Sequence, residues 1–216
     1  MPARLGSWMS FDAIAPWYDG AETLLAGTLL QRARTTWIDA VAVDARVLSA
    51  GEGHGRFADA LLQRRPAVEL TCLDASPGMR RVAQRRLARH ARLARWVHAD
   101  ATAWRPEPAS YDVIATHFFL DCFDAASLDR VIDLLATAAR PRSLWLVTDF
   151  AVPPAGLARV RAAAMHRVMY SAFRRLTTLQ ATRLTPPDPL LAARGFVLRD
   201  RREYSWGLVR ADVWQR

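Results

Sequence analysis

Val47-Leu48-Ser49-Ala50-Gly51-Glu52-Gly53-His54-Gly55-Arg56-Phe57 is a segment in which a short apolar run leads directly into three glycines at alternate positions. Apolar residues then continue at helical spacing, so the segment predicts a strand, a tight turn and a helix. Glycine suits such a turn because it accepts positive φ and, lacking a Cβ, lets the backbone approach a ligand, while the helix N-terminus offers unpaired N–H groups. The pattern indicates a nucleotide-type site, although the same glycine spacing also occurs in turns that hold no ligand.

Strands and helices alternate along the rest of the chain. The alternation favours an α/β fold, a Rossmann-like, doubly wound sheet of seven mostly parallel strands with an N-terminal helical attachment. The last two strands are joined at 205–207, which is too short for a parallel crossover, so they predict an antiparallel C-terminal hairpin. The expected strands are 46–50, 68–73, 93–98, 111–116, 143–150, 196–204 and 206–214.

The composition bounds the class of protein. The chain has 216 residues, 51% of them hydrophobic, which is enough for one domain with a full core. Two cysteines are too few for a disulfide framework, and no uninterrupted apolar stretch reaches membrane-spanning length. We therefore expect a single cytoplasmic domain without a membrane span.

The net charge of +9 comes from arginine, because the chain has no lysine. The arginines are densest on an expected helix between Arg80 and Arg95, where a solvated face and a footprint for an anionic partner are both open interpretations. Aromatic side chains do not interleave with these arginines, so a surface that stacks single-stranded nucleic acid is not favoured. Nucleic acid is therefore a disfavoured partner, although the charge keeps it open as an alternative.

Asp74 closes the second expected strand, 23 positions after Gly51. At this spacing an acid at the end of a strand reaches the ribose hydroxyls of a bound nucleotide. The structural alternative is that Asp74 caps the helix that begins at Ser76-Pro77. The agreement between its position and the glycine turn favours the ribose.

Four short motifs follow one another along the chain: Val47-Leu48-x-x-Gly51-x-Gly53-x-Gly55, Leu73-Asp74, Ala99-Asp100-Ala101 and Tyr111-Asp112-Val113-Ile114. This ordered set resembles the class I S-adenosylmethionine-dependent methyltransferases. The resemblance covers about residues 45–214, and it includes an acid after the third strand and the closing hairpin, neither of which a Rossmann dehydrogenase needs. The segment Phe11-Asp12-x-Ile14-Ala15-x-x-Tyr18-Asp19 also looks like the opening of the ubiquinone/menaquinone-biosynthesis-type branch, whose members methylate small molecules.

The resemblance implies S-adenosylmethionine as the cofactor and S-adenosylhomocysteine as its product. It implies that Gly51 and Gly53 lie against the methionine part and the ribose, and that Asp74 holds the ribose hydroxyls. Asp100 would accept from the adenine amino group, with the Ala101 N–H on a ring nitrogen. The full set expected at the cofactor is Ser49, Gly51, Glu52, Gly53, Asp74, Ala75, Met79, Asp100, Ala101, Thr116 and His117.

One position departs from the family pattern. The family often has an acid two residues before the first glycine, where this chain has Ser49, while Glu52 stands between the first two glycines. The sequence therefore leaves open which group contacts the ammonium of the methionine part, and water or a backbone carbonyl could do so.

Methyl transfer from a sulfonium is an in-line displacement that needs no metal, so catalysis can rest largely on alignment. The resemblance implies that segment 116–118 faces the methyl group. His117 is the expected base because it follows the fourth strand at the ligand-binding edge. A histidine hydrogen-bonded at a strand-to-loop junction is an equal alternative, and Asp121 has helix capping as its own alternative. The expected catalytic residues are His117, Asp121 and Tyr18, and the expected substrate-binding residues are Tyr18, Phe118, His166 and Tyr170.

The sequence thus predicts an enzyme that methylates an O, N, S or C atom of a small, apolar or aromatic metabolite. Two alternatives stay open: an RNA or DNA methyltransferase, which the charge suggests, and a non-catalytic scaffold or cofactor sensor, which Ser49 slightly supports. A homodimer is open as well. The expected division is 1–43 for an N-terminal helical cap, 44–150 for the cofactor-binding core, 151–194 for a substrate-side helical segment and 195–216 for the hairpin.

Overall fold

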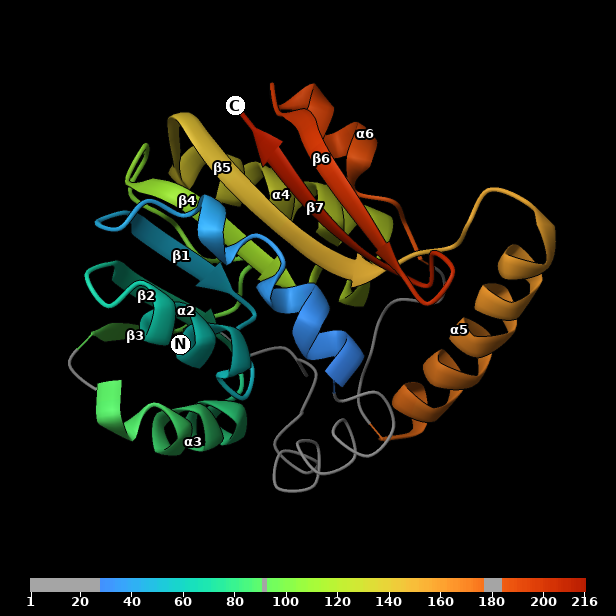
Figure 1. The fold of residues 1–216 in the computed structure, drawn as a ribbon, viewed down its shortest axis with the longest axis horizontal. Coiled ribbons are helices and arrows are strands. Elements are labelled where there is room, and N and C mark those ends of the chain that lie inside the picture. Colours follow the sequence, from blue (N-terminus) through green and yellow to red (C-terminus); the bar gives the residue numbers. More distant parts are fainter. Residues whose placement is uncertain (1–27, 91–92, 177–183) are drawn as a thin grey trace, which may run out of the picture.

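Seven strands form one sheet in the computed structural model, which describes residues 28–90, 93–176 and 184–216 (Figure 1). From edge to edge the strands are β3 (Ala94–His98), β2 (Glu69–Asp74), β1 (Arg46–Ala50), β4 (Tyr111–His117), β5 (Ala139–Phe150), β7 (Val209–Gln215) and β6 (Val197–Tyr204). Strands β1 to β5 pair in parallel, whereas β7 is antiparallel to both β5 and β6. The predicted seven-stranded, mostly parallel α/β fold with its antiparallel C-terminal strands is confirmed, whereas residues 1–27 of the expected N-terminal helical cap lie outside the described residues.

Helices cover both faces of the sheet. One face packs against α2 (Arg56–Arg64), α3 (Pro77–Arg86) and a 3-10 turn at Ile38–Ala40, and the other packs against α4 (Ala125–Ala138) and α6 (Asp188–Ala193). Two further 3-10 turns are Ala88–His90 and Leu120–Cys122, and a helical stretch at 28–35 precedes the sheet. The long helix α5 (Gly156–Leu176) lies beside the sheet (Figure 1). None of the helices in the described ranges is both long and apolar enough to cross a membrane.

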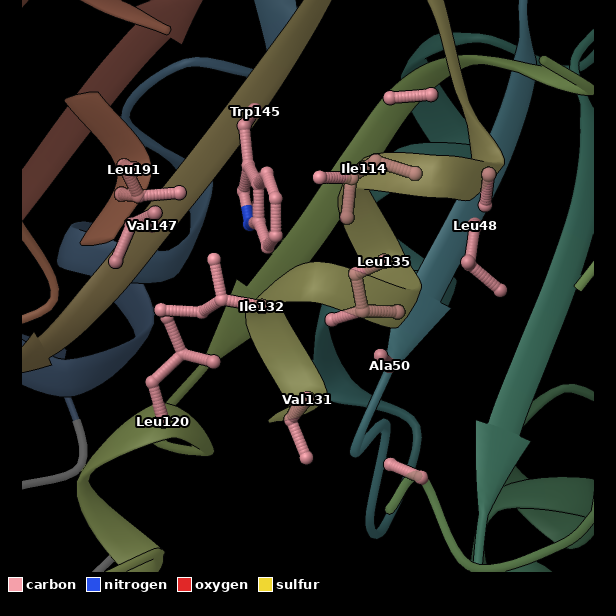
Figure 2. Packing of buried hydrophobic residues seen from close by; sticks show 14 of the residues in the cluster. Leu48, Ala50, Ile114, Leu120, Val131, Ile132, Leu135, Trp145, Val147 and Leu191 are labelled. Atoms are coloured by element: carbon pink, nitrogen blue, oxygen red, sulfur yellow. The ribbon is translucent and has the colours of Figure 1, made fainter. Parts of the chain in front are cut away.

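Side chains on adjacent positions of a strand point to opposite faces, which divides the core into two layers. Leu48 of β1 packs in the layer under α4, whereas its neighbour Val47 packs in the layer under α2. Trp145 of β5 is fully buried in the α4 layer, where its Nε1 donates to Thr116 Oγ1 at 3.0 Å. Figure 2 shows the Trp145 ring beside Ile132 of α4. This fully buried tryptophan therefore has its polar atom satisfied.

The expected arginine-rich helix is shorter than predicted. Helix α3 ends at Arg86, and Arg95 lies on β3 instead. Leu87 ends the helix while its side chain, 1% exposed, packs against the glycine turn, so close that a Cβ on Gly55 would lie 2.8 Å from its Cδ1. The arginines between 80 and 95 thus do not share one helical face.

Two strand boundaries differ from the prediction by more than one residue, namely the starts of β5 and β7. Strand β5 begins at Ala139, directly after α4, and continues through Pro141. Strand β7 begins at Val209 because Ser205, Trp206 and Gly207 all take positive φ (50°, 59° and 78°) and form the turn of the hairpin.

Candidate functional site

A cleft of about 1030 Å³, its open mouth included, lies where β1, β2, β3 and β4 end. It is lined by residues that directly follow these strands, among them Gly51, Ala75, Ala99 and Phe118. This is the edge at which open α/β sheets bind their ligands. All the residues expected at the cofactor line the cleft, except Thr116.

The glycine turn takes the backbone conformation that its sequence predicts. The φ angles are +70° at Gly51, +60° at Gly53 and +83° at Gly55. The Gly51 N–H donates to the carbonyl of Leu73 at 2.8 Å, which ties the turn to β2. A Cβ on Gly51 would lie 2.0 Å from Cδ2 of Phe119, so the backbone and the neighbouring ring both require glycine here.

Asp74 connects two loops of the cleft. Its Oδ2 accepts from the Gly53 N–H at 2.7 Å, and its Oδ1 accepts from the Ser76 N–H at 2.8 Å. The N-cap of α3 is Ser76, whose Oγ accepts from the Met79 N–H at 3.1 Å, so the predicted alternative of an Asp74 cap is wrong. The Asp74 carboxylate is instead held in the wall of the cleft, where it connects the glycine turn to the loop before α3.

Asp100 is fixed in a similar way at the end of β3. Its Oδ1 accepts from the Thr102 N–H at 2.9 Å and its Oδ2 from the Thr102 hydroxyl at 2.8 Å. Asp100 and Ala101 line the cleft on the side away from β4. Two acids, each at the end of its own strand, therefore face one cleft.

The side chain of Glu52 lies against the end of β1. Its Oε2 accepts from Ser49 Oγ at 2.5 Å, and its Oε1 accepts from the Ala58 N–H at 2.9 Å in the first turn of α2. Burial raises the pKa of Glu52 to about 7, although the hydrogen bonds from Ser49 and Ala58 and the charge of Arg34 lower it. The cleft therefore contains a buried carboxyl group that titrates near neutral pH.

His117 lies in the cleft with its ring centroid 4.3 Å from that of Phe57. Neither ring nitrogen has a hydrogen-bond partner among the described residues. Burial, together with the nearby charge of Arg34, lowers the pKa of His117 to about 3. His117 is therefore a neutral imidazole at neutral pH, with one donor and one acceptor, and a weak base in the open cleft.

We expect the buried His117 to make the protein less stable in acid. The unfolded chain protonates this residue below about pH 6.5, whereas the folded chain does so only near pH 3, so stability is lost as the pH falls through this window. Between pH 6.5 and pH 5 the loss is about 2 kcal/mol. Urea unfolding of the wild type and of His117→Leu at several pH values measures it. The difference between the two curves cancels the titration of Glu52 and Asp121, and parallel curves would contradict the prediction.

Two expected site residues lie away from the cleft. Thr116 is fully buried on the α4 face of the sheet, because it alternates with His117, and it accepts from Trp145. Asp121 does not line the cleft either; its carboxylate accepts from the Cys122 thiol at 3.6 Å, and burial raises its pKa to about 6. The cap of α4 is Asp124, which accepts from the Ser127 N–H, so capping by Asp121 is wrong as well.

The expected substrate residues are only partly brought together. Phe118 lines the cleft at a positive φ of 53°, with the Arg34 guanidinium 4.8 Å from its ring centroid. His166 does not line the cleft; its ring is 5.8 Å from that of Phe150, which in turn is 5.2 Å from that of Phe118. Tyr18 and the family-like segment 11–19 lie outside the described residues, and Tyr170 is described only as part of the backbone of α5.

Several cleft residues escaped the sequence analysis. Phe119 and Phe123 form an edge-to-face pair, 5.0 Å between ring centroids, and the four-residue spacing of these aromatics after β4 was a usable signal. Arg34 enters from the helical stretch 28–35, and nothing in its local sequence separates it from the other arginines. The further cleft residues that were not predicted are His54, Phe57, Leu73, Ser76, Ala99 and Cys122.

Comparison with known proteins agrees with this arrangement. Residues 47–142 match the family described as "Methyltransferase domain". A malonyl-[acyl-carrier protein] O-methyltransferase from Paenibacillus sp. (strain JDR-2) is 33% identical over 92 residues, which make up 41% of this chain and 32% of that protein. The chain thus spans about a third of the relative that it matches in sequence.

Solved structures share the fold. An O-methyltransferase family protein from Burkholderia thailandensis has a TM-score of 0.71 at 17% identity, over 94% of this chain and 59% of its own. The 1,6-didemethyltoxoflavin-N1-methyltransferase of the same organism, solved with 1,6-didemethyltoxoflavin and S-adenosylhomocysteine, has a TM-score of 0.67 at 17% identity, over 95% and 85%. Residues 47–142 of this chain are thus similar to a methyltransferase domain, and the described residues share their fold with solved methyltransferases.

Proposed function

We propose that this protein is an enzyme that transfers the methyl group of S-adenosylmethionine to an O, N, S or C atom of a small, apolar or aromatic metabolite. The observation that carries the proposal is the carboxylate of Asp74, which both adjoining loops hold in the cleft at the end of β2. An acid at this point of an open α/β sheet is suited to the two hydroxyls of a ribose. The match of residues 47–142 to a methyltransferase domain supports the same reading.

The residues of the cleft fit this cofactor. Gly51 and Gly53 present bare backbone to the ribose and the methionine part. Asp74 offers acceptors to the ribose hydroxyls, and Asp100 with the Ala101 N–H offers an acceptor and a donor to the edge of an adenine. An apolar wall for the ring comes from side chains such as Met79 and Phe123.

The bound cofactor supplies a methyl group on a positively charged sulfur, which an acceptor atom displaces in line. The main task of the chain is then to align the acceptor and to exclude water. His117, neutral and with both ring nitrogens unpartnered among the described residues, can hold a hydroxyl or an amine by a hydrogen bond. Phe118 and Phe119 give the same region an apolar surface, which supports an apolar or aromatic acceptor. A relative of similar fold that binds 1,6-didemethyltoxoflavin together with S-adenosylhomocysteine supports a small acceptor.

The test is methyl transfer itself. We expect the protein to convert S-adenosylmethionine to S-adenosylhomocysteine in the presence of at least one member of a panel of phenols, N-heterocycles, thiols and carboxylic acids. Mass spectrometry of the acceptor identifies the methylated atom, and total tRNA serves as a further arm of the panel. Failure to bind S-adenosylmethionine would refute the proposal. Binding without turnover across the panel would instead favour a non-catalytic cofactor sensor, and methylation of the tRNA alone would favour a nucleic-acid enzyme.

A further inference from the structure

We infer that Glu52 replaces the acid that is missing at position 49, and that its carboxylate binds the amino group of the methionine part of the cofactor. The inference rests on the proposed cofactor and deepens it. It starts from Ser49, the position at the end of β1 where the resemblance to class I methyltransferases led us to expect an acid. The structure assigns the negative charge of that position to a residue three places further along the chain.

The side chain of Glu52 places its carboxylate beside Ser49, at the end of β1. Glu52 leaves the backbone between the first two glycines, yet its Oε2 reaches Ser49 Oγ at 2.5 Å. Ser49 is 2% exposed and Glu52 is 8% exposed, and both line the cleft beside Gly51 and Gly53. A serine at this position is what the arrangement needs, because a carboxylate at 49 would repel that of Glu52, whereas a hydroxyl donates to it.

Support for helix α2 does not by itself explain a charged side chain here. The Ala58 N–H, in the first turn of α2, needs one acceptor, and Glu52 Oε1 supplies it at 2.9 Å. A neutral glutamine would supply the same acceptor. The Glu52 carboxylate is nine-tenths buried, and burying a charge costs free energy that a neutral residue would not cost. A cationic ligand in the cleft would offset that cost.

Charges of both signs act on Glu52. Arg34 contributes the positive charge that acts on it, while Asp74 contributes a negative one. An incoming ammonium would stabilise the carboxylate and lower its pKa from about 7, so cofactor binding should release a proton and tighten as the pH rises through 7. The titratable or charged groups that face Glu52 or share its cleft are Arg34 from 28–35, Cys72 and Asp74 from β2, His54 from the glycine turn, Asp100 after β3 and His117 and Cys122 at and after β4.

A two-by-two titration separates the ammonium contact from every other contribution. Wild type and Glu52→Gln are each titrated calorimetrically with S-adenosylhomocysteine and with its deamino analogue, which keeps the carboxylate but lacks the amino group. Glutamine preserves the acceptor for Ala58 and a hydrogen bond with Ser49, so the fold is expected to persist. We expect Glu52→Gln to weaken S-adenosylhomocysteine binding about 10- to 100-fold and to leave the Kd of the deamino analogue unchanged within about twofold.

Two further variants complete the test. Ser49→Asp in the Glu52→Gln background restores an acid at position 49 and should recover most of the lost affinity for S-adenosylhomocysteine. Glu69→Gln removes an exposed acid at the opposite end of β2 and should change neither ligand's Kd. For wild type, titrations at pH 6, 7 and 8 in buffers of different ionisation enthalpy should show proton release that Glu52→Gln lacks.

The outcomes distinguish the two proposals. If wild type binds neither ligand, the cofactor proposal fails. If wild type binds S-adenosylhomocysteine but Glu52→Gln weakens both ligands equally, or weakens neither, the cofactor stands and the role of Glu52 is overturned. A thermal melt of Glu52→Gln checks that any loss is not caused by unfolding.

Discussion

Replacing Asp74 with alanine is expected to weaken the binding of S-adenosylhomocysteine by at least about 100-fold. The variant would lose the two charge-assisted hydrogen bonds between the Asp74 carboxylate and the ribose, each worth about 1.5–3 kcal/mol. The N–H groups of Gly53 and Ser76 would also lose their acceptor, so both loops of the cleft would be less well held. Isothermal titration calorimetry on the wild type and the variant measures the change in Kd.

The matched control is Asp124→Ala. Asp124 also accepts a backbone hydrogen bond, from Ser127 at 2.8 Å, but it caps α4 and does not line the cleft. This variant should lose about 1 kcal/mol of stability while its Kd for S-adenosylhomocysteine stays unchanged. Undiminished binding by Asp74→Ala would show that the ribose is held elsewhere and would remove the main support for the proposed function.

Gly51→Ala is expected to be the most damaging small substitution in the glycine turn. The alanine would have to adopt a φ of +70°, which costs about 1–2 kcal/mol, and its Cβ would overlap the ring of Phe119, which costs about 1–3 kcal/mol more. Phe119 lines the cleft, so its displacement should also impair the binding of S-adenosylhomocysteine. Urea unfolding and calorimetry measure the two effects.

Gly195→Ala separates the free-energy cost of backbone strain from the cost of steric overlap. Gly195 has a φ of +81°, but nothing lies within 4 Å of the place of its Cβ, so this variant should show the backbone cost alone. In a Phe119→Ala background, Gly51→Ala should fall to the same cost, since the overlapping ring is gone. Equal losses for Gly51→Ala and Gly195→Ala in the wild-type background would contradict the predicted clash.

The parts of the site that local sequence controls were predictable. The turn at Gly51, Gly53 and Gly55 has positive φ at three alternate positions, and glycine at each of them already predicts this conformation. Asp74 was found because it closes the second expected strand 23 positions after Gly51, and Asp100 was found because the motif Ala99-Asp100-Ala101 resembles that of the class I methyltransferases. The alternation of strands and helices likewise indicated the layers of the fold before any contact was known.

Other residues depended on partners far away in the sequence. Thr116 and His117 are neighbours, and only the docking of α4 and Trp145 on one face decides that His117, not Thr116, faces the cleft. Arg34 reaches the site because residues 28–35 pack on the sheet, where Thr148 Oγ1 donates to the Ala33 carbonyl at 3.4 Å. Neither contact can be predicted from the local sequence pattern.

By itself, then, the sequence determined the glycine turn, the two acids at strand ends and the order of strands and helices, since each follows from backbone preferences and side-chain periodicity over a few residues. Only the tertiary structure decided the partner of Glu52, the burial that moves the pKa values of Glu52 and His117, and the exclusion of Thr116 and Asp121 from the cleft. These properties depend on how much water the packed elements exclude and on which distant side chains they bring into contact.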